Sequence, residues 1–174
     1  MKLKLFLFSI YIAIFNLIAF PQADSLIAPH YLRIKGTDIE LMPPKFFITL
    51  PSQNNVLVHP STSSTIQVNE MKGLGYPLSI SKLTNEHIEK QGAKLIFKKD
   101  TVMANGNKAT LYLIRFKVTG KDANHTTLEY ERYMLFSGDY NNTMWINANY
   151  PVIAKETIAP VLLKSILSAR FTKQ

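Results

Sequence analysis

The sequence predicts an α+β domain in which helices cover an antiparallel β-sheet. Three features support this class: several segments alternate apolar with polar residues, an Asn105-Gly106 pair separates two such segments, and apolar residues recur at helical spacing near the C-terminus. Alternation is typical of strands, Asn-Gly of tight hairpins, and a spacing of three and four residues of amphipathic helices. A helix between strands, a meander and a closing helix together favour α+β.

Residues 1–25 have the pattern of a signal peptide. Lys2 and Lys4 precede a long apolar run, and small residues follow it, so cleavage fits after either Ala23 or Ser25. We therefore expect export to the periplasm or out of the cell. The alternative is an uncleaved anchor, because the apolar run approaches the length of a short spanning helix. Membrane association is expected only if this segment is retained.

Length and composition narrow the class of protein further. The chain has 174 residues, a formal net charge of +8 and no cysteine. It is long enough for one domain with a core of its own after loss of a signal peptide. The lack of cysteine excludes disulfides, a lipid-attached lipoprotein, thiolate zinc sites and cysteine nucleophiles. The basic residues are scattered rather than clustered, so we expect no nucleic-acid partner.

The first half of the chain is expected to hold an extended lead-in, strands and one short helix. Residues 26–44 contain three prolines and no clear periodicity, so we interpret them as the lead-in to a single domain at 45–174. Strands are expected at 46–51 and 65–71. The helix begins after Thr84, a good N-cap, and ends before Gly92.

The second half is expected to form a meander closed by a helix. The Asn105-Gly106 turn joins strands at 94–103 and 109–119, and further strands follow at 128–136 and 143–148. In the strand at 109–119, the face with Arg115 and Lys117 is expected to be the wetter one. Apolar spacing over 158–169 predicts the last helix, in which Pro160 is tolerable only in the first turn.

The order of these elements resembles the PsbP/DcrB-like superfamily. The resemblance covers 45–171 and is carried by LTNEHIEKQGAKLIF, NGNKATLYLIRFKV, YERYMLFSGD, TMWINANYP and ILSARF. It implies a PsbP-like α/β/α sandwich, a central antiparallel sheet with helices on both faces. It also implies a binding or assembly protein, because the superfamily has no common catalytic set.

No pattern in the chain predicts catalysis, a metal or a cofactor. The four histidines are dispersed, and the sequence has no nucleophile elbow, phosphate-binding loop or dinucleotide fingerprint. Glu129 and Glu131 share one face of a strand, and a hydrolase would need such a pair to flank a cleft. We interpret them instead as solvated residues with Arg115 and Lys117 as cross-strand partners.

Aromatic residues near the C-terminal meander are the candidates for a partner surface. Aromatic and arginine side chains are common anchors of protein interfaces. Strand alternation places Tyr133 and Trp145 together, opposite the more apolar faces of their strands. The full candidate set is Arg132, Tyr133, Tyr140, Trp145 and Tyr150, of which Arg132 and Tyr150 fall on the other face by alternation.

These observations favour an exported, non-enzymatic binding or assembly protein of the cell envelope. Its partner would be an envelope or secreted protein, and an immunity-type protein is one concrete form. The alternative is a periplasmic module that binds a small ligand or lipid in a pocket between the sheet and the C-terminal helix, beneath Leu162 and Ile166. A hydrolase is disfavoured, because it would need convergent titratable groups in a cleft.

Overall fold

The computed structural model describes residues 26–120 and 126–172. The predicted signal peptide at 1–25 lies outside these residues. Within them the chain forms a seven-stranded antiparallel sheet in the order β3-β4-β5-β9-β8-β7-β6. The strands are β3 (Ile48–Leu50), β4 (Gln53–His59), β5 (Ser64–Lys72), β6 (Lys94–Val102), β7 (Lys108–Thr119), β8 (Thr127–Gly138) and β9 (Asn142–Pro151).

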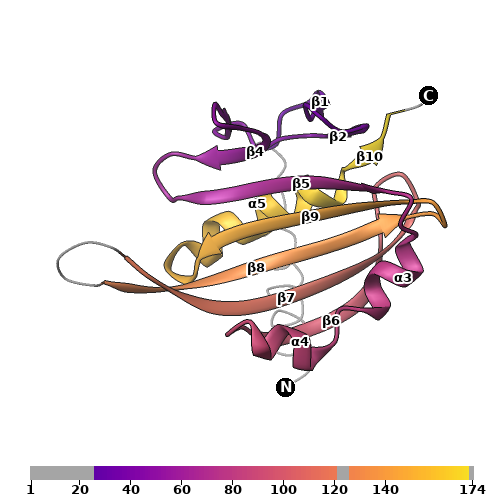
Figure 1. Ribbon diagram of the computed structural model, residues 1–174. Coiled ribbons are helices and arrows are strands. Elements are labelled where there is room, and N and C mark those ends of the chain that lie inside the picture. The colour runs from indigo at the N-terminus through magenta and orange to yellow at the C-terminus, as the bar shows by residue number, and fades with distance from the viewer. Residues whose placement is uncertain (1–25, 121–125, 173–174) are drawn as a thin grey trace, which may run out of the picture.

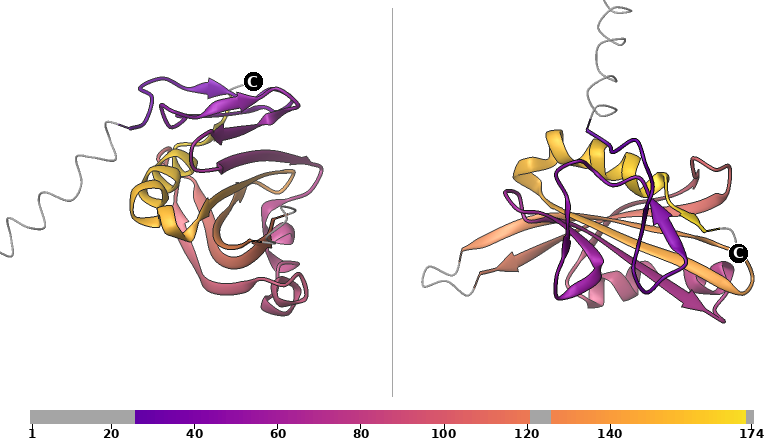
Figure 2. Two further views of the ribbon diagram at one scale, coloured as in Figure 1. Left: turned by 90° about the vertical axis from the view of Figure 1, so that its left-hand side faces the viewer. Right: turned by 90° about the horizontal axis from the view of Figure 1, so that it is seen from above.

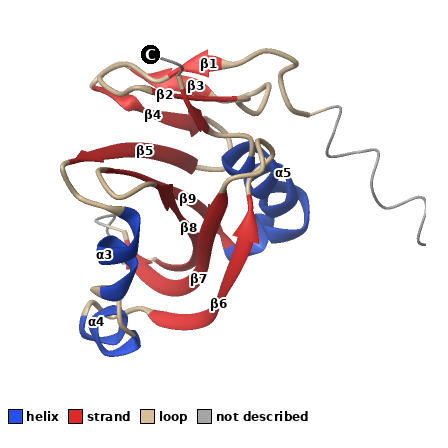
Figure 3. Ribbon diagram, turned by 90° about the vertical axis from the view of Figure 1, so that its right-hand side faces the viewer, coloured by secondary structure: helices blue, strands red, loops and turns tan. Residues whose placement is uncertain are grey.

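Helices cover both faces of this sheet, which confirms the predicted α/β/α arrangement. The 3₁₀ turn η1 (Val152–Ala154) leads into α5 (Lys155–Leu167), which crosses one face. The short helices α3 (Tyr76–Ser81) and α4 (Asn85–Lys90) lie against the opposite face, as Figures 1 and 3 show. The views in Figure 2 show the strong twist of the sheet between these two layers.

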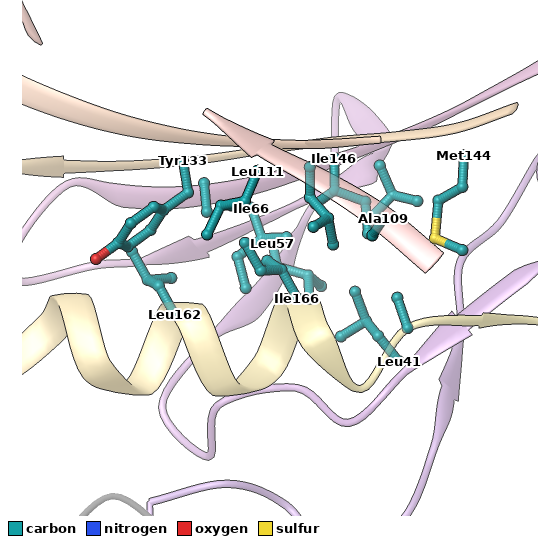
Figure 4. Close-up of a cluster of buried hydrophobic side chains, with 14 of the residues drawn as sticks. Leu41, Leu57, Ile66, Ala109, Leu111, Tyr133, Met144, Ile146, Leu162 and Ile166 are labelled. Carbon is teal, nitrogen blue, oxygen red and sulfur yellow. The ribbon is translucent and has the colours of Figure 1, made fainter. Parts of the chain in front are cut away.

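The main core lies between the sheet and α5. Leu162 and Ile166 point from the helix toward Leu57, Ile66 and Ile146 of the sheet (Figure 4), and all five are at most 1% exposed. Side chains buried to this degree in one cluster are closely packed and supply most of the hydrophobic stabilisation. The α5 face of the sheet is therefore a filled core.

Residues 26–44, expected as a lead-in, contribute to the same core. Strands β1 (Leu32–Arg33) and β2 (Ile39–Leu41) form a small second sheet with β10 (Arg170–Phe171). Ile39 and Leu41 are fully buried in the main cluster. The prolines lie outside these strands, where they do not interrupt the pairing.

Local predictions around the turns are largely confirmed. The Thr84 hydroxyl accepts a hydrogen bond from the His87 backbone N–H at 3.2 Å and caps α4. The β6–β7 hairpin turns at Gly106, whose φ of +85° is the left-handed conformation that glycine tolerates.

Three local predictions are wrong. Helix α3 was not expected, because six residues are too few for a clear helical period. Helix α5 begins earlier than predicted, so Pro160 lies in its second turn rather than its first. Both faces of β7 are buried along its first half, because Leu111 and Leu113 pack in the core, and the wetter face begins only at Arg115.

Candidate functional site

The candidate site is a cleft of about 480 Å³ between the sheet and the short helices α3 and α4. Its floor is apolar and comes from three adjacent strands: Ile114 of β7, Met134 and Phe136 of β8, and Trp145 of β9. The remaining lining residues are Gln67, Met71, Leu74, Ser79, Lys82, Leu83, His87, Ile88, Gln91, Ala93, Arg132 and Asn147. No carboxylate is among these residues.

Strand register brings the floor residues together. Phe136 is directly opposite Trp145, and Met134 is opposite Asn147, so all four lie on one face of the sheet. The rings of Phe136 and Trp145 stack with centroids 5.9 Å apart and planes 8° from parallel. The Trp145 indole N–H donates to the Asn147 side-chain oxygen at 3.0 Å, which fixes the ring over the floor.

Helix α3 is held in place by contacts with β9 and the turn before it. The Thr143 hydroxyl donates to the Leu74 carbonyl at 2.7 Å and lies 3.2 Å from the Ser79 hydroxyl. Gly75 passes so close to the β8–β9 turn that an added Cβ would lie 2.4 Å from the Tyr140 carbonyl oxygen. Glycine at this position therefore allows the wall of the cleft to approach the sheet.

Arg132 stands at one end of the floor. Its Nε–H donates to the Asn149 side-chain oxygen at 2.5 Å, and its Cζ lies 4.8 Å from the centroid of the Phe116 ring. Burial lowers the pKa of the guanidinium below its usual value, although an arginine remains protonated in proteins. Arg132 is thus oriented by a hydrogen bond and a cation–π contact.

The structure divides the predicted aromatic surface between two faces. Tyr133 is opposite Ala148 and Tyr150 is opposite Glu131, so both tyrosines face α5, with ring centroids 5.6 Å apart. They are 9% and 0% exposed. The expectation that Tyr133 and Trp145 share a face is wrong, because the register places Trp145 with Arg132.

Tyr140 is separate from both groups. It lies in the β8–β9 turn and is 87% exposed. The role of Arg132, Tyr140 and Trp145 in binding a partner stays a prediction.

Glu131 is a buried charge that sequence reasoning placed in solvent. Its side chain is fully buried, so the expectation of a solvated residue is wrong. The predicted partner is confirmed: Arg115 Nη2 donates to Glu131 at 2.6 Å. Arg115 binds Oε1, whereas the Tyr150 hydroxyl donates to Oε2 at 2.8 Å and Lys155 Nζ of α5 lies 3.1 Å from the same Oε2. Alternation alone did not reveal that α5 would cover this position.

These donors keep Glu131 ionised. Burial raises the pKa of its carboxyl, but hydrogen bonds from Arg115, Tyr150 and Lys155 together lower it below the usual glutamate value. Burial and the hydrogen bond to Glu131 raise the pKa of the Tyr150 hydroxyl. Neither Glu131 nor Glu129 lines the cleft, and Glu129 lies 4.0 Å from Lys117 on the outer part of the hairpin. We interpret Glu131 as a structural ion-pair centre.

Within 26–120 and 126–172, no three histidine, aspartate or glutamate side chains lie close enough to hold a metal ion. No helix in these ranges is both long and apolar enough to span a bilayer.

The sheet, its two helical layers and their order define an α+β protein with the Mog1p/PsbP-like fold. Two solved structures show this. The chain is similar to cyanobacterial PsbP (CyanoP) from Synechocystis sp. PCC 6803, with a TM-score of 0.54 and 10% identity over 82% of this chain and 91% of the other. It is equally similar to the Saccharomyces cerevisiae Ran-binding protein Mog1p, with a TM-score of 0.53 and 10% identity over 83% and 95%.

A structure from Bacteroides thetaiotaomicron also aligns, at 12% identity and a TM-score of 0.43. The alignment covers 78% of this chain and 46% of that one, so this chain spans less than half of that protein. No protein-family model matches the chain, and no curated protein has a significantly similar sequence. The similarity to CyanoP and Mog1p establishes the Mog1p/PsbP-like fold, in agreement with the PsbP-like fold expected from the sequence.

Replacing Glu131 by glutamine should destabilise the fold and change its acid sensitivity. The free energy of unfolding should fall by about 2 kcal/mol. This is less than the usual cost of breaking a buried ion pair, because Arg115 and Lys155 are partly exposed and can be rehydrated. The carboxyl of Glu131 has a lower pKa in the folded than in the unfolded protein, so its ionised form stabilises the fold. This contribution is complete above the unfolded glutamate pKa and is lost as the pH falls through the folded pKa. Urea unfolding of both proteins between about pH 7 and pH 2 should therefore show their stabilities converging below about pH 4.

Glu129→Gln is the matched control. It removes a carboxylate two residues away on the same strand, where the ion pair with Lys117 is exposed. Its effect should stay within about 0.5 kcal/mol at any pH. Equal effects of the two substitutions would contradict the structural role assigned to Glu131.

Proposed function

We propose that this protein is a non-enzymatic binding module that holds a small apolar or amphipathic ligand in the cleft between the sheet and helices α3 and α4. The observation that carries the proposal is the floor of Ile114, Met134, Phe136 and Trp145 beneath an accessible volume of about 480 Å³. Ligand pockets are commonly about 300 to 1,000 Å³, mostly apolar, with a few polar groups that orient the ligand. Gln67, Asn147 and Arg132 are polar groups of this kind.

The proposed site lies on the face opposite to the one considered from the sequence. A pocket beneath Leu162 and Ile166 is not favoured, because both side chains are fully buried in a filled core. The α3–α4 face also contains methionines, Met71 and Met134, whose flexible side chains adapt to ligands of different shape.

Trp145 provides a direct test, since it is the only tryptophan in the chain. The uncharged probe N-phenyl-1-naphthylamine should bind in the cleft, with increased probe emission and energy transfer from Trp145. Ala93→Phe should weaken this binding about tenfold, because the added ring occupies volume at the cleft wall. Fluorescence titration measures both effects, and thermal unfolding verifies that the variant is folded.

Tyr140→Ala is the control for this experiment. It removes an aromatic side chain from the surface without touching the cleft lining. Probe affinity should be unchanged. If the probe fails to bind the wild-type protein, or if Ala93→Phe binds it as tightly as the wild type does, the cleft is not a ligand site.

A second candidate function is binding of an envelope or secreted protein through the β7–β8 hairpin. The hairpin projects beyond its neighbours (Figure 1), because β6 pairs with β7 only as far as Arg115. Val118 and Leu128 form a cross-strand pair near its end, and they are 44% and 48% exposed. The ring of Phe116 stacks on Tyr130 beside them. Apolar groups on a projecting ribbon are typical of interaction sites.

Crosslinking in the native cell, followed by mass spectrometry, tests this second candidate. A stoichiometric partner should be captured by the wild-type protein and lost in a Val118→Ser, Leu128→Ser variant, because the apolar pair would no longer be buried on binding. The free energy of unfolding of the variant should lie within about 1 kcal/mol of the wild-type value, since both residues are already exposed. A Thr119→Ala control changes the same hairpin at a polar position, and loss of capture in this control would refute the apolar contact.

We propose export on the pattern of residues 1–25 alone. N-terminal sequencing of protein recovered from the envelope fraction should give a mature chain that begins at Asp24 or Leu26, after cleavage at Ala23 or Ser25. A full-length chain in the membrane fraction would indicate the anchor, and a full-length chain in the cytoplasm would contradict export.

A further inference from the structure

Arg132 differs from the other arginines in its surroundings. The chain has four arginines, all within the described residues. Arg33, Arg115 and Arg170 each pair with a carboxylate at 2.9 Å or less. Among the described residues, no carboxylate lies within ion-pair distance of Arg132. A half-buried guanidinium without an anion is energetically costly, because its lost hydration is not replaced by a counter-charge.

The contacts of Arg132 leave most of its donors available. Of its five N–H groups, only the Nε–H has a hydrogen-bond partner among the described residues, the Asn149 oxygen at 2.5 Å. Asn149 is itself fixed, since its amide N–H donates to the Thr65 hydroxyl at 2.9 Å. The Phe116 ring lies against one face of the guanidinium. The group is therefore held in one orientation, and its terminal N–H donors have no partner within 26–120 and 126–172.

The rest of the cleft adds a second cation and no anion. Lys82, the C-cap residue of α3, also lines the cleft, and no lining residue is acidic. The floor beside Arg132 is apolar: Met134 and Phe136 follow on the same face of β8, and Trp145 lies opposite Phe136 on β9. The cleft thus combines one oriented cation with an apolar surface that continues from it.

We infer that the ligand of this cleft is an amphipathic monocarboxylate whose apolar body lies over Trp145 and Phe136 and whose carboxylate pairs with the terminal N–H groups of Arg132. A planar guanidinium binds a carboxylate through two parallel hydrogen bonds, which a point charge such as lysine cannot reproduce. This inference rests on the proposed ligand-binding function and specifies the chemistry of the ligand.

Paired probes of equal chain length test the inference. Decanoate and decan-1-ol have the same apolar chain. They are titrated into the protein below their micelle or solubility limits while Trp145 emission is recorded. The wild type should bind decanoate about tenfold to a hundredfold more tightly than decanol, the range expected of a charge-assisted hydrogen-bond pair. Decyltrimethylammonium should bind more weakly than decanol, because the cleft lining is cationic.

Variants then assign the preference to Arg132. Arg132→Gln should remove the preference for decanoate and leave decanol affinity within about twofold. Arg132→Lys should retain only part of the preference for decanoate. Lys117→Gln is the matched control, because it removes a nearby positive charge on the opposite face of β7 and should leave decanoate binding unchanged. Thermal unfolding checks that each variant is folded.

The outcomes separate the two proposals. If decanol and decanoate bind the wild type equally, the cleft binds apolar ligands but the inferred carboxylate recognition is wrong. If Lys117→Gln reduces decanoate binding as much as Arg132→Gln, the preference reflects net charge and not the Arg132 pair. If neither decanol, decanoate nor the uncharged naphthylamine probe binds, the proposed function fails and the inference fails with it.

Discussion

Strand β9 is hydrogen bonded along most of its length to β5 on one side and to β8 on the other, and this double pairing determines what each face of the sheet contains. Because side chains alternate with a period of two, one register sends Ile146, Ala148 and Tyr150 toward α5 and Trp145 and Asn147 toward α3 and α4. A shift by one residue would exchange the core and the cleft. The hydrophobic core and the candidate site therefore depend on the same pairing.

Two neighbouring residues of β8 show the consequence of that alternation. Glu131 faces α5 and is surrounded by donors from β7, β9 and α5, so its charge is balanced by Arg115 and Lys155. Arg132, the next residue, faces the cleft and has a neutral amide and an aromatic ring as its neighbours. Buried charges in proteins are usually paired. The pairing of Glu131 is explained by the fold itself, whereas Arg132, which has no carboxylate partner among the described residues, is the basis of the proposed ligand contact.

The sequence alone predicted the fold class, the β6–β7 hairpin, the α4 cap and the alternation within β8 and β9, because each depends on local spacing or on one punctuating residue. The candidate site depended on relations between distant segments. Alternation within β8 and within β9 was correct, but their relative register and the helix over each face are set by tertiary packing. Tyr133 and Trp145 were therefore grouped wrongly. Helix α3, which forms a wall of the cleft, was too short to leave a periodic signal.

The unequal helical layers explain why the candidate cleft lies on the α3–α4 face of the sheet. Helix α5 has 13 residues, about 20 Å at 1.5 Å per residue, and it crosses several strands. Helices α3 and α4 have six residues each, about 9 Å, and together they cover only the part of their face near Tyr112, Ile114 and Phe136. The apolar floor also includes Trp145, which is only partly buried, and the apolar pair of Val118 and Leu128 lies farther along the hairpin. Longer helices would have buried this surface; the short ones leave it accessible, and they bring Lys82 and His87 to its margin.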